Sequence, residues 1–289
     1  MTKWGAPAAA AVAMLWCPLA QAQDMPELEP VSPWSVDYAE DSCRLIRTFG
    51  EGDDQVTLGM TAYEPGGRFF LSIVGNLTKT ARSAATVRVA LDEVEQFSVR
   101  YLQGDFDGRP GIVITNPISI GPVPEDAAQR MRALQLVESY SDPAVEEQVA
   151  TIAFIDGFER EFAVRTGSLR APLEALKDCN KELTTHWDID VAAHERLSRI
   201  AVPRSAPWSW LRWRSYPREM RQPMLINYRL IVNTKGRVAG CSVAGAEPDS
   251  EYAQITCDQL RKNGRFAPAL NEQGKAVQSY FVWWADLRG

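Results

Sequence analysis

The stretch Met224-Leu-Ile-Asn-Tyr-Arg-Leu-Ile-Val232 decides how the C-terminal part of the chain folds. It is rich in β-branched and aromatic residues with partial alternation, which is typical of a β-strand. The turn-forming segment Asn233-Thr-Lys-Gly-Arg237 follows, and its Gly236 can supply the positive φ that a tight turn requires. We therefore predict a hairpin whose return strand covers Val238 to Val243.

A helix is predicted after this hairpin. Ser250 can accept hydrogen bonds from the first backbone amides of a helix, and Asn263-Gly264 is a common helix end. Between them, Tyr252, Ile255 and Leu260 fall near one helical stripe. The segment from Glu247 to Gly264 therefore predicts an amphipathic helix.

A third strand is predicted from Val277 to Ala285, because this segment concentrates Tyr280, Phe281, Trp283 and Trp284. The predicted order of elements is strand, strand, helix, strand. A set of short motifs accompanies this order: Tyr216-Pro217, Gly236-Arg-Val238, Cys241-Ser-Val243, Cys257, Arg265-Phe-Ala-Pro-Ala269, Gly274 and Val282-Trp283. In their order and spacing these motifs resemble the TonB C-terminal domain, over residues 214–287 only.

The resemblance implies a small ββαβ domain that acts in the periplasm. Domains of that family bind a short extended peptide of an outer-membrane transporter and take part in energy-coupled transport across the outer membrane. The physical route is strand addition at an unpaired sheet edge. The candidate peptide-binding edge is the last strand, through Val277, Ser279, Phe281 and Trp283. The alternative is that the aromatic residues of this strand pack against the helix, because strand aromatics usually belong to a core.

Residues 1–22 are predicted to be a secretory signal peptide. They contain Lys3, an apolar run from Ala6 to Ala20, and the cleavage pattern Ala20-Gln-Ala22. The run is shorter than the roughly 20 residues that a membrane-spanning helix needs. We therefore expect a periplasmic or secreted protein, without the retained membrane anchor and Pro-rich spacer of typical TonB proteins.

Four cysteines remain after the predicted cleavage: Cys43, Cys179, Cys241 and Cys257. An even number of cysteines in an exported chain predicts disulfides, and three pairings are possible. We favour Cys43 with Cys179 and Cys241 with Cys257, because the second pair would join the return strand to the helix. The spacing contains no Cys-x-x-Cys pair, so no metal site is predicted.

No constellation of side chains predicts catalysis. The chain has only two histidines and no Gly-x-Ser-x-Gly motif, and paired carboxylates such as Glu146-Glu147 are expected on solvated faces. We therefore predict no catalytic residue and no cofactor, and a protein-binding module in place of an enzyme. The alternative function is an envelope hydrolase or ligand-binding protein with its site in the N-terminal domain.

That N-terminal domain, residues 34–190, is predicted to be an antiparallel β-rich unit with two helices, which makes the whole chain α+β. The helices are expected from Pro124 to Tyr140 and, capped by Ser168, up to Thr184. The expected strands are Trp34 to Arg47, Gln55 to Tyr63, Arg68 to Val74, Thr86 to Leu91, Gln96 to Leu102, Gly111 to Thr115, Val149 to Ile155 and Glu161 to Arg165.

Residues 191–215 are predicted to link this domain to the C-terminal domain, residues 216–289. The linker interleaves Trp208, Trp210 and Trp213 with arginines, which indicates either a membrane or peptidoglycan contact or tryptophans that pack against both domains. Residues 23–213 carry 19 Lys and Arg against 30 Asp and Glu, whereas residues 214–289 carry 11 against 7. Because the total charge is acidic and export is expected, no nucleic-acid partner is predicted.

Overall fold

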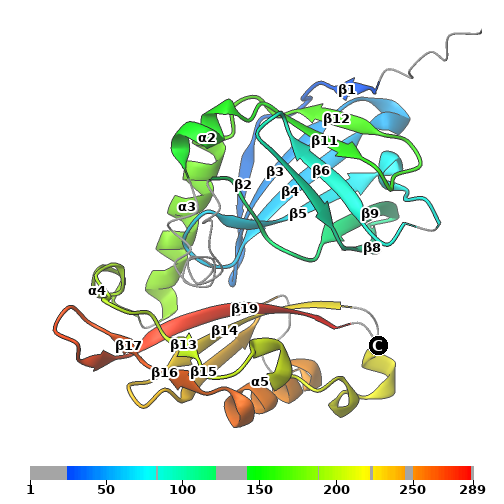
Figure 1. Ribbon diagram of the computed structural model, residues 1–289. Coiled ribbons are helices and arrows are strands. Elements are labelled where there is room, and N and C mark those ends of the chain that lie inside the picture. The colour runs from blue at the N-terminus through cyan, green and yellow to red at the C-terminus, as the bar shows by residue number, and fades with distance from the viewer. Residues whose placement is uncertain are drawn as a thin grey trace, which may run out of the picture.

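The structure is a computed structural model that describes residues 25–82, 84–121, 142–187, 189–221, 224–244 and 250–287. It is a mixed α+β chain in which strands dominate, and its elements form two units (Figure 1). The described residues contain two hydrophobic cores, one in each unit. The predicted signal peptide at residues 1–22 and the predicted helix at residues 124–140 lie outside the described residues.

The first unit is built from two sheets that are antiparallel except for one parallel pair, β1 with β12. The larger sheet has the order β2 (Ser35–Tyr38), β3 (Cys43–Phe49), β4 (Val56–Ala62), β5 (Arg68–Gly75), β9 (Arg109–Ile114), β8 (Tyr101–Phe106), and β10 (Ile118–Ser119) also pairs with β5. The smaller sheet has the order β1 (Glu27–Leu28), β12 (Phe162–Arg165), β11 (Thr151–Ile155), β6 (Val87–Leu91), β7 (Glu95–Val99).

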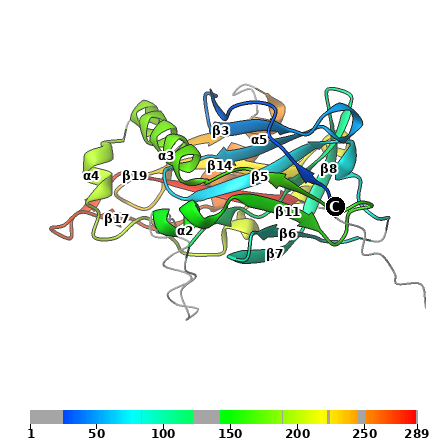
Figure 2. The same ribbon diagram turned by 90° about the horizontal axis from the view of Figure 1, so that it is seen from above.

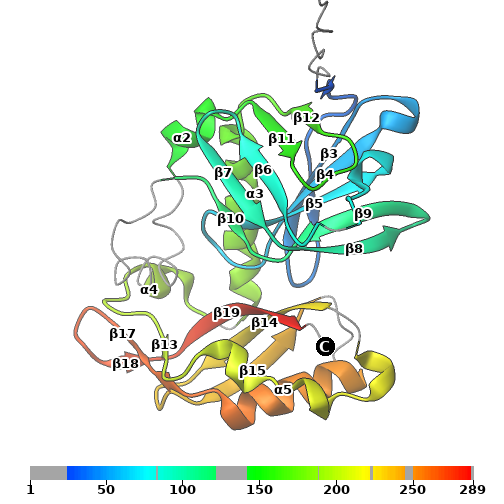
Figure 3. The ribbon, with the colours of Figure 1, turned by 45° about the vertical axis from the view of Figure 1, so that its right-hand side comes forward.

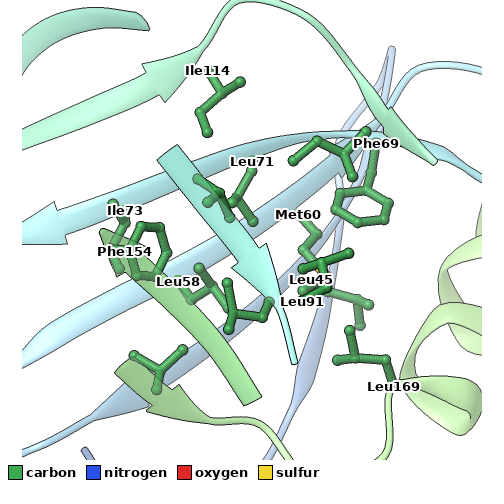
Figure 4. Packing of buried hydrophobic residues seen from close by; sticks show 14 of the residues in the cluster. Leu45, Leu58, Met60, Phe69, Leu71, Ile73, Leu91, Ile114, Phe154 and Leu169 are labelled. Carbon is green, nitrogen blue, oxygen red and sulfur yellow. The ribbon is translucent and has the colours of Figure 1, made fainter. Parts of the chain in front are cut away.

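The first core lies between these two sheets. Alternate residues of a strand point to one face, so Leu58 and Met60 of β4 reach the same core as Leu91 of β6 and Phe154 of β11 (Figure 4). Each of these four side chains is at most 1% exposed. The predicted antiparallel β-rich unit is therefore confirmed as two facing sheets.

Helices α2 (Pro143–Gln148) and α3 (Arg170–Thr184) cover one end of this core. The second predicted helix is thus confirmed, and Ser168 Oγ accepts a hydrogen bond from the Arg170 amide at 3.4 Å. The disulfide Cys43–Cys179 joins α3 to the first residue of β3. The expected solvation of Glu146 is wrong, because Glu146 is 2% exposed and accepts a hydrogen bond from Lys177 Nζ at 2.7 Å.

The second unit contains a three-stranded antiparallel sheet with the order β15 (Val238–Val243), β14 (Met224–Val232), β19 (Ser279–Leu287). Helix α5 (Glu251–Asn263) packs on one face, with Ser250 as its N-cap and Gly264 as its C-cap. The predicted hairpin and helix are confirmed. Gly236 has a φ of 69°, and a Cβ there would lie 2.1 Å from the carbonyl oxygen of Phe266, so both conformation and space require glycine. The predicted disulfide Cys241–Cys257 joins β15 to α5.

The predicted strand from Val277 to Ala285 is divided in the structure. Val277 belongs to β18 (Ala276–Val277), which pairs with β17 (Ala269–Leu270), and β19 starts at Ser279. A further short pair joins β13 (Val202–Pro203) to β16 (Phe266–Ala267). The other helices within the described ranges are α4 (Val191–Glu195) and the 3-10 turns Gly52–Asp54, Asn76–Thr78, Thr185–Trp187, Pro207–Trp210, Trp213–Ser215 and Arg218–Met220.

The segment predicted as a linker, residues 191–215, contributes to the second core. Ala201, Trp210 and Leu211 are buried in it, and Trp213 packs against it. Trp208, in contrast, is 67% exposed. The second core therefore begins before residue 216, and Trp210 and Trp213 of the predicted linker pack in it.

Candidate functional site

The three-stranded sheet of the second unit is covered on one face by α5. Of the β19 residues that point to this face, Ser279, Phe281 and Ala285 are 0%, 7% and 3% exposed, and Trp283 is half-buried against the same core. Phe281 packs against Phe266 with ring centroids 5.0 Å apart. This face is therefore closed core.

The opposite face of the same sheet lies against the first unit (Figures 2 and 3). Alternate side chains of β19 supply the contacts: Tyr280 meets Trp187 edge to face at 5.1 Å, and Trp284 meets Phe70 at 5.9 Å between centroids. At the end of the strand, Asp286 lies 3.7 Å from Arg100. We call this contact between the two units the seam.

The other two strands of the sheet also reach across the seam. Arg229 Nη1 of β14 lies 3.3 Å from Asp41 Oδ1, and Ser242 of β15 donates a hydrogen bond to the same oxygen at 3.0 Å. The Arg229 guanidinium lies 4.2 Å from the centre of the Trp187 ring. Burial lowers the pKa of Arg229 from its ordinary value, since desolvation outweighs the attraction of Asp41.

A buried ion pair lies beside Trp284 on the first unit's side of the seam. Arg68 donates a hydrogen bond from Nη2 to Glu64 Oε1, and its guanidinium lies 5.3 Å from the centre of the Trp284 ring. Arg68 Nη1 is buried and has no hydrogen-bond partner. Burial raises the pKa of Glu64 despite the neighbouring Arg68.

Three small cavities follow the seam. One is lined by Asp41 and Arg229, the second by His194 and Tyr280, and the third by Arg68 together with residues 282–284 of β19. All three therefore adjoin β19, the second near its start and the other two near its middle. Each is only large enough for about one or two water molecules.

Because both faces of this sheet are covered, we consider its two edges as the place where a partner could add a strand. β19 pairs with β14 over nine consecutive residue pairs, and no other strand of the described residues pairs with β19. β15, at the other edge, has only six residues, and its pairing with β14 has a register shift at Ile231/Val232. Short, irregular edge strands resist strand addition, whereas long, regular ones favour it. The outer edge of β19 is therefore the candidate binding site.

The structure separates the four residues predicted for this edge. Ser279, Phe281 and Trp283 lie on β19, and Val277 lies on β18. The side chains of Ser279 and Phe281 are buried, and Trp283 is half-buried and stacks on Phe281 at 5.8 Å. Consequently β19 can offer its main chain to a partner, but not the side chains of Ser279 and Phe281.

The contacts across the seam could not be predicted from the sequence, because no local pattern identifies the residues that form them. Asp41 follows a strand in the first unit, and Arg229 lies inside a predicted strand of the second unit. The two residues are separated by 188 positions in the sequence. The one available indication was an arginine among the apolar residues of Met224–Val232.

Within the described ranges, no group of three or more His, Cys, Asp or Glu side chains could hold a metal ion. None of the helices described there is long and apolar enough to span a membrane. The chain matches no protein-family model, no curated protein and no solved structure.

Proposed function

We propose that the protein is an exported adaptor that binds an extended segment of a cell-envelope protein along the outer edge of β19. The observation that carries the proposal is the nine-residue pairing of β19 on one side only, within the described part of the chain. An added strand would form main-chain hydrogen bonds with β19, and its alternate side chains would provide selectivity.

The surroundings of β19 support this mode of binding. One face of the strand is fixed by the core around α5 and the other by the seam, so β19 is held in place before a partner arrives. A pre-organised edge reduces the conformational entropy lost on binding. Side chains of an added strand that point toward the first unit would approach the cavities next to Tyr280 and Trp284.

The resemblance to the TonB C-terminal domain supports the same proposal. Three of its motifs occupy defined places in the sheet module: Gly236 in the hairpin turn, Cys241 in β15 and Cys257 in α5. Two disulfides are typical of proteins that fold outside the reducing cytoplasm. We propose that the compartment is the periplasm and that the partner belongs to the outer membrane.

The experiment uses a phage-displayed library of random peptides, selected on the disulfide-bonded protein. A photoreactive benzoylphenylalanine in place of the half-buried Trp283 should crosslink to a selected peptide. The same residue in place of Tyr38, which is 64% exposed on β2, is the matched control and should not crosslink. Crosslinking at Tyr38 alone, or selection of no extended peptide, would contradict the proposal.

A further inference from the structure

Trp208 differs from the other tryptophans that the structure describes. Trp34, Trp187, Trp210, Trp213, Trp283 and Trp284 are buried or half-buried, whereas Trp208 is 67% exposed. Its neighbour Trp210 is 1% exposed and donates a hydrogen bond from Nε1 to Ser205 Oγ at 2.6 Å. Trp210 therefore anchors the 3-10 turn Pro207–Trp210 to the second core, and the turn holds the Trp208 ring toward solvent.

Three exposed cations lie on segments that adjoin the Pro207–Trp210 turn. The Arg212 amide donates to Gln259 Oε1 at 2.6 Å, and Asn263 Nδ2 donates to the Trp210 carbonyl at 2.7 Å, so the turn runs along the C-terminal flank of α5. Lys262 follows Gln259 by three positions and shares this flank.

Arg204 completes the group, since its Nε donates to the Phe266 carbonyl at 3.0 Å, just beyond the end of α5. We define the Trp208 surface as Arg204, Trp208, Arg212 and Lys262, all of which are exposed.

We propose that the Trp208 surface docks the protein on the interface of an anionic phospholipid bilayer. Indole rings favour the boundary between headgroups and acyl chains, and arginine and lysine beside them interact with lipid phosphates. A bilayer interface offers an apolar layer and anionic groups together, which this combination of side chains requires. A glycan or a peptide would not need both.

The charge distribution of the chain supports this orientation. The acidic residues are concentrated in the first unit, and the C-terminal residues 214–289 carry a basic excess. An anionic surface would attract the second unit and repel the first, so the molecule would approach with the Trp208 surface in front. The Trp208 surface and the outer edge of β19 use different residues, although the Pro207–Trp210 turn packs on β19 through Trp210 and Phe281, whose ring centroids lie 6.2 Å apart.

The test is co-sedimentation of the disulfide-bonded protein with vesicles of phosphatidylglycerol and phosphatidylcholine, compared with phosphatidylcholine alone. We expect binding only to the anionic vesicles, a loss of about tenfold in Trp208→Ala, and about fivefold in each of Arg204→Gln and Arg212→Gln. High salt should weaken the binding. Tyr38→Ala removes a similarly exposed aromatic ring from the first unit and should leave binding unchanged.

Equal binding of Trp208→Ala and the wild type, or equal binding to both kinds of vesicle, would overturn the proposal. Binding to isolated peptidoglycan without binding to anionic vesicles would also overturn it. Circular dichroism would verify that Trp208→Ala is folded, as its exposure predicts. Peptide crosslinking at Trp283 should persist in this variant, which separates failure of docking from failure of strand addition.

Discussion

The guanidinium of Arg229, in the central strand of the second unit, lies 4.2 Å from the ring centre of Trp187, in the 3-10 turn that follows α3 in the first unit. The same guanidinium lies 3.3 Å from Asp41 Oδ1. Arg229 thus joins the two units through a cation–π contact and an ion pair. Both contacts involve partly desolvated groups, so they are stronger than the same contacts at a fully exposed surface. The seam thereby fixes the sheet whose edge is the candidate site.

Replacement of Asp41 by Ala should weaken this connection. Arg229 would lose its anion and Ser242 its acceptor, and we expect a loss of about 1–3 kcal/mol in the free energy of unfolding. Urea denaturation measures this change. The control is Asp37→Ala, which breaks the Arg44 pair at 2.7 Å, where both side chains are nearly half exposed. Its expected cost is about 0–1 kcal/mol, so equal losses in the two variants would contradict the role of the seam.

The buried Glu64 should give the protein a specific pH dependence. Its folded-state pKa is raised by burial, so its contribution to stability is complete below the ordinary carboxyl pKa and is lost as the pH rises through the folded pKa. Glu64→Gln removes this titration. The stability of Glu64→Gln relative to the wild type, measured by urea denaturation, should therefore increase as the pH rises above the ordinary carboxyl range. Glu93→Gln, at an exposed position, is the control, and a decrease for Glu64→Gln would refute the assignment.

The two disulfides should differ in what they stabilise. Cys43–Cys179 spans 136 positions and Cys241–Cys257 spans 16. Loop-closure entropy predicts losses of about 5 and 3 kcal/mol when each pair is replaced by alanines. Denaturation followed by exchange of individual amides would localise the first loss to the β-rich unit and the second to the β15 and α5 region. Identical profiles for both double variants would show that the two units unfold as one.

Ser279 allows the packing of β19 to be tested from the α5 face. Its side chain is 0% exposed, and Oγ has no hydrogen-bond partner. Ser279→Ala should leave the free energy of unfolding unchanged or raise it by about 1 kcal/mol, because it removes an unsatisfied buried hydroxyl. Ser279→Glu should cost more than about 3 kcal/mol, because it buries an unpaired charge. Because Ser279→Glu is expected to lower the free energy of unfolding, a loss of peptide binding in this variant could not be assigned to the binding edge.

Elements with local markers could be predicted from the sequence. Gly236 identified the hairpin turn, Ser250 and Asn263-Gly264 identified both ends of α5, and the even number of cysteines led to both disulfide pairs. Each of these features depends on residues that are close in sequence or on few possible combinations. Most strands of the first unit were also predicted within a few residues of their observed positions. Two of these predictions were wrong: Trp34 to Arg47 is divided into β2 and β3, and Gln96 to Leu102 covers the end of β7 and the start of β8, which belong to different sheets.

Features that depend on the packing of distant segments could not be predicted. The break between Val277 and Ser279 is fixed by pairing with Ala269 and Val232, two segments far apart in the chain. Glu146 is buried because α3 brings Lys177 beside it, and the seam brings Asp41 to Arg229. Trp208 and Trp210 have similar sequence surroundings, and Trp210 is the buried one because its ring packs against Phe266 and Phe281, which are distant in the chain.

Residue-resolved amide hydrogen exchange of β19, with and without a selected peptide, shows whether the outer edge of this strand is free and whether it accepts an added strand. Amides of an edge strand alternate between the paired and the outer side, so between Phe281 and Ala285 every second amide should exchange fast in the free protein. Those fast amides should become protected when the peptide binds, while the amides bonded to β14 stay slow. Uniformly slow exchange along β19 in the free protein, or peptide binding without new protection there, would contradict strand addition at this edge.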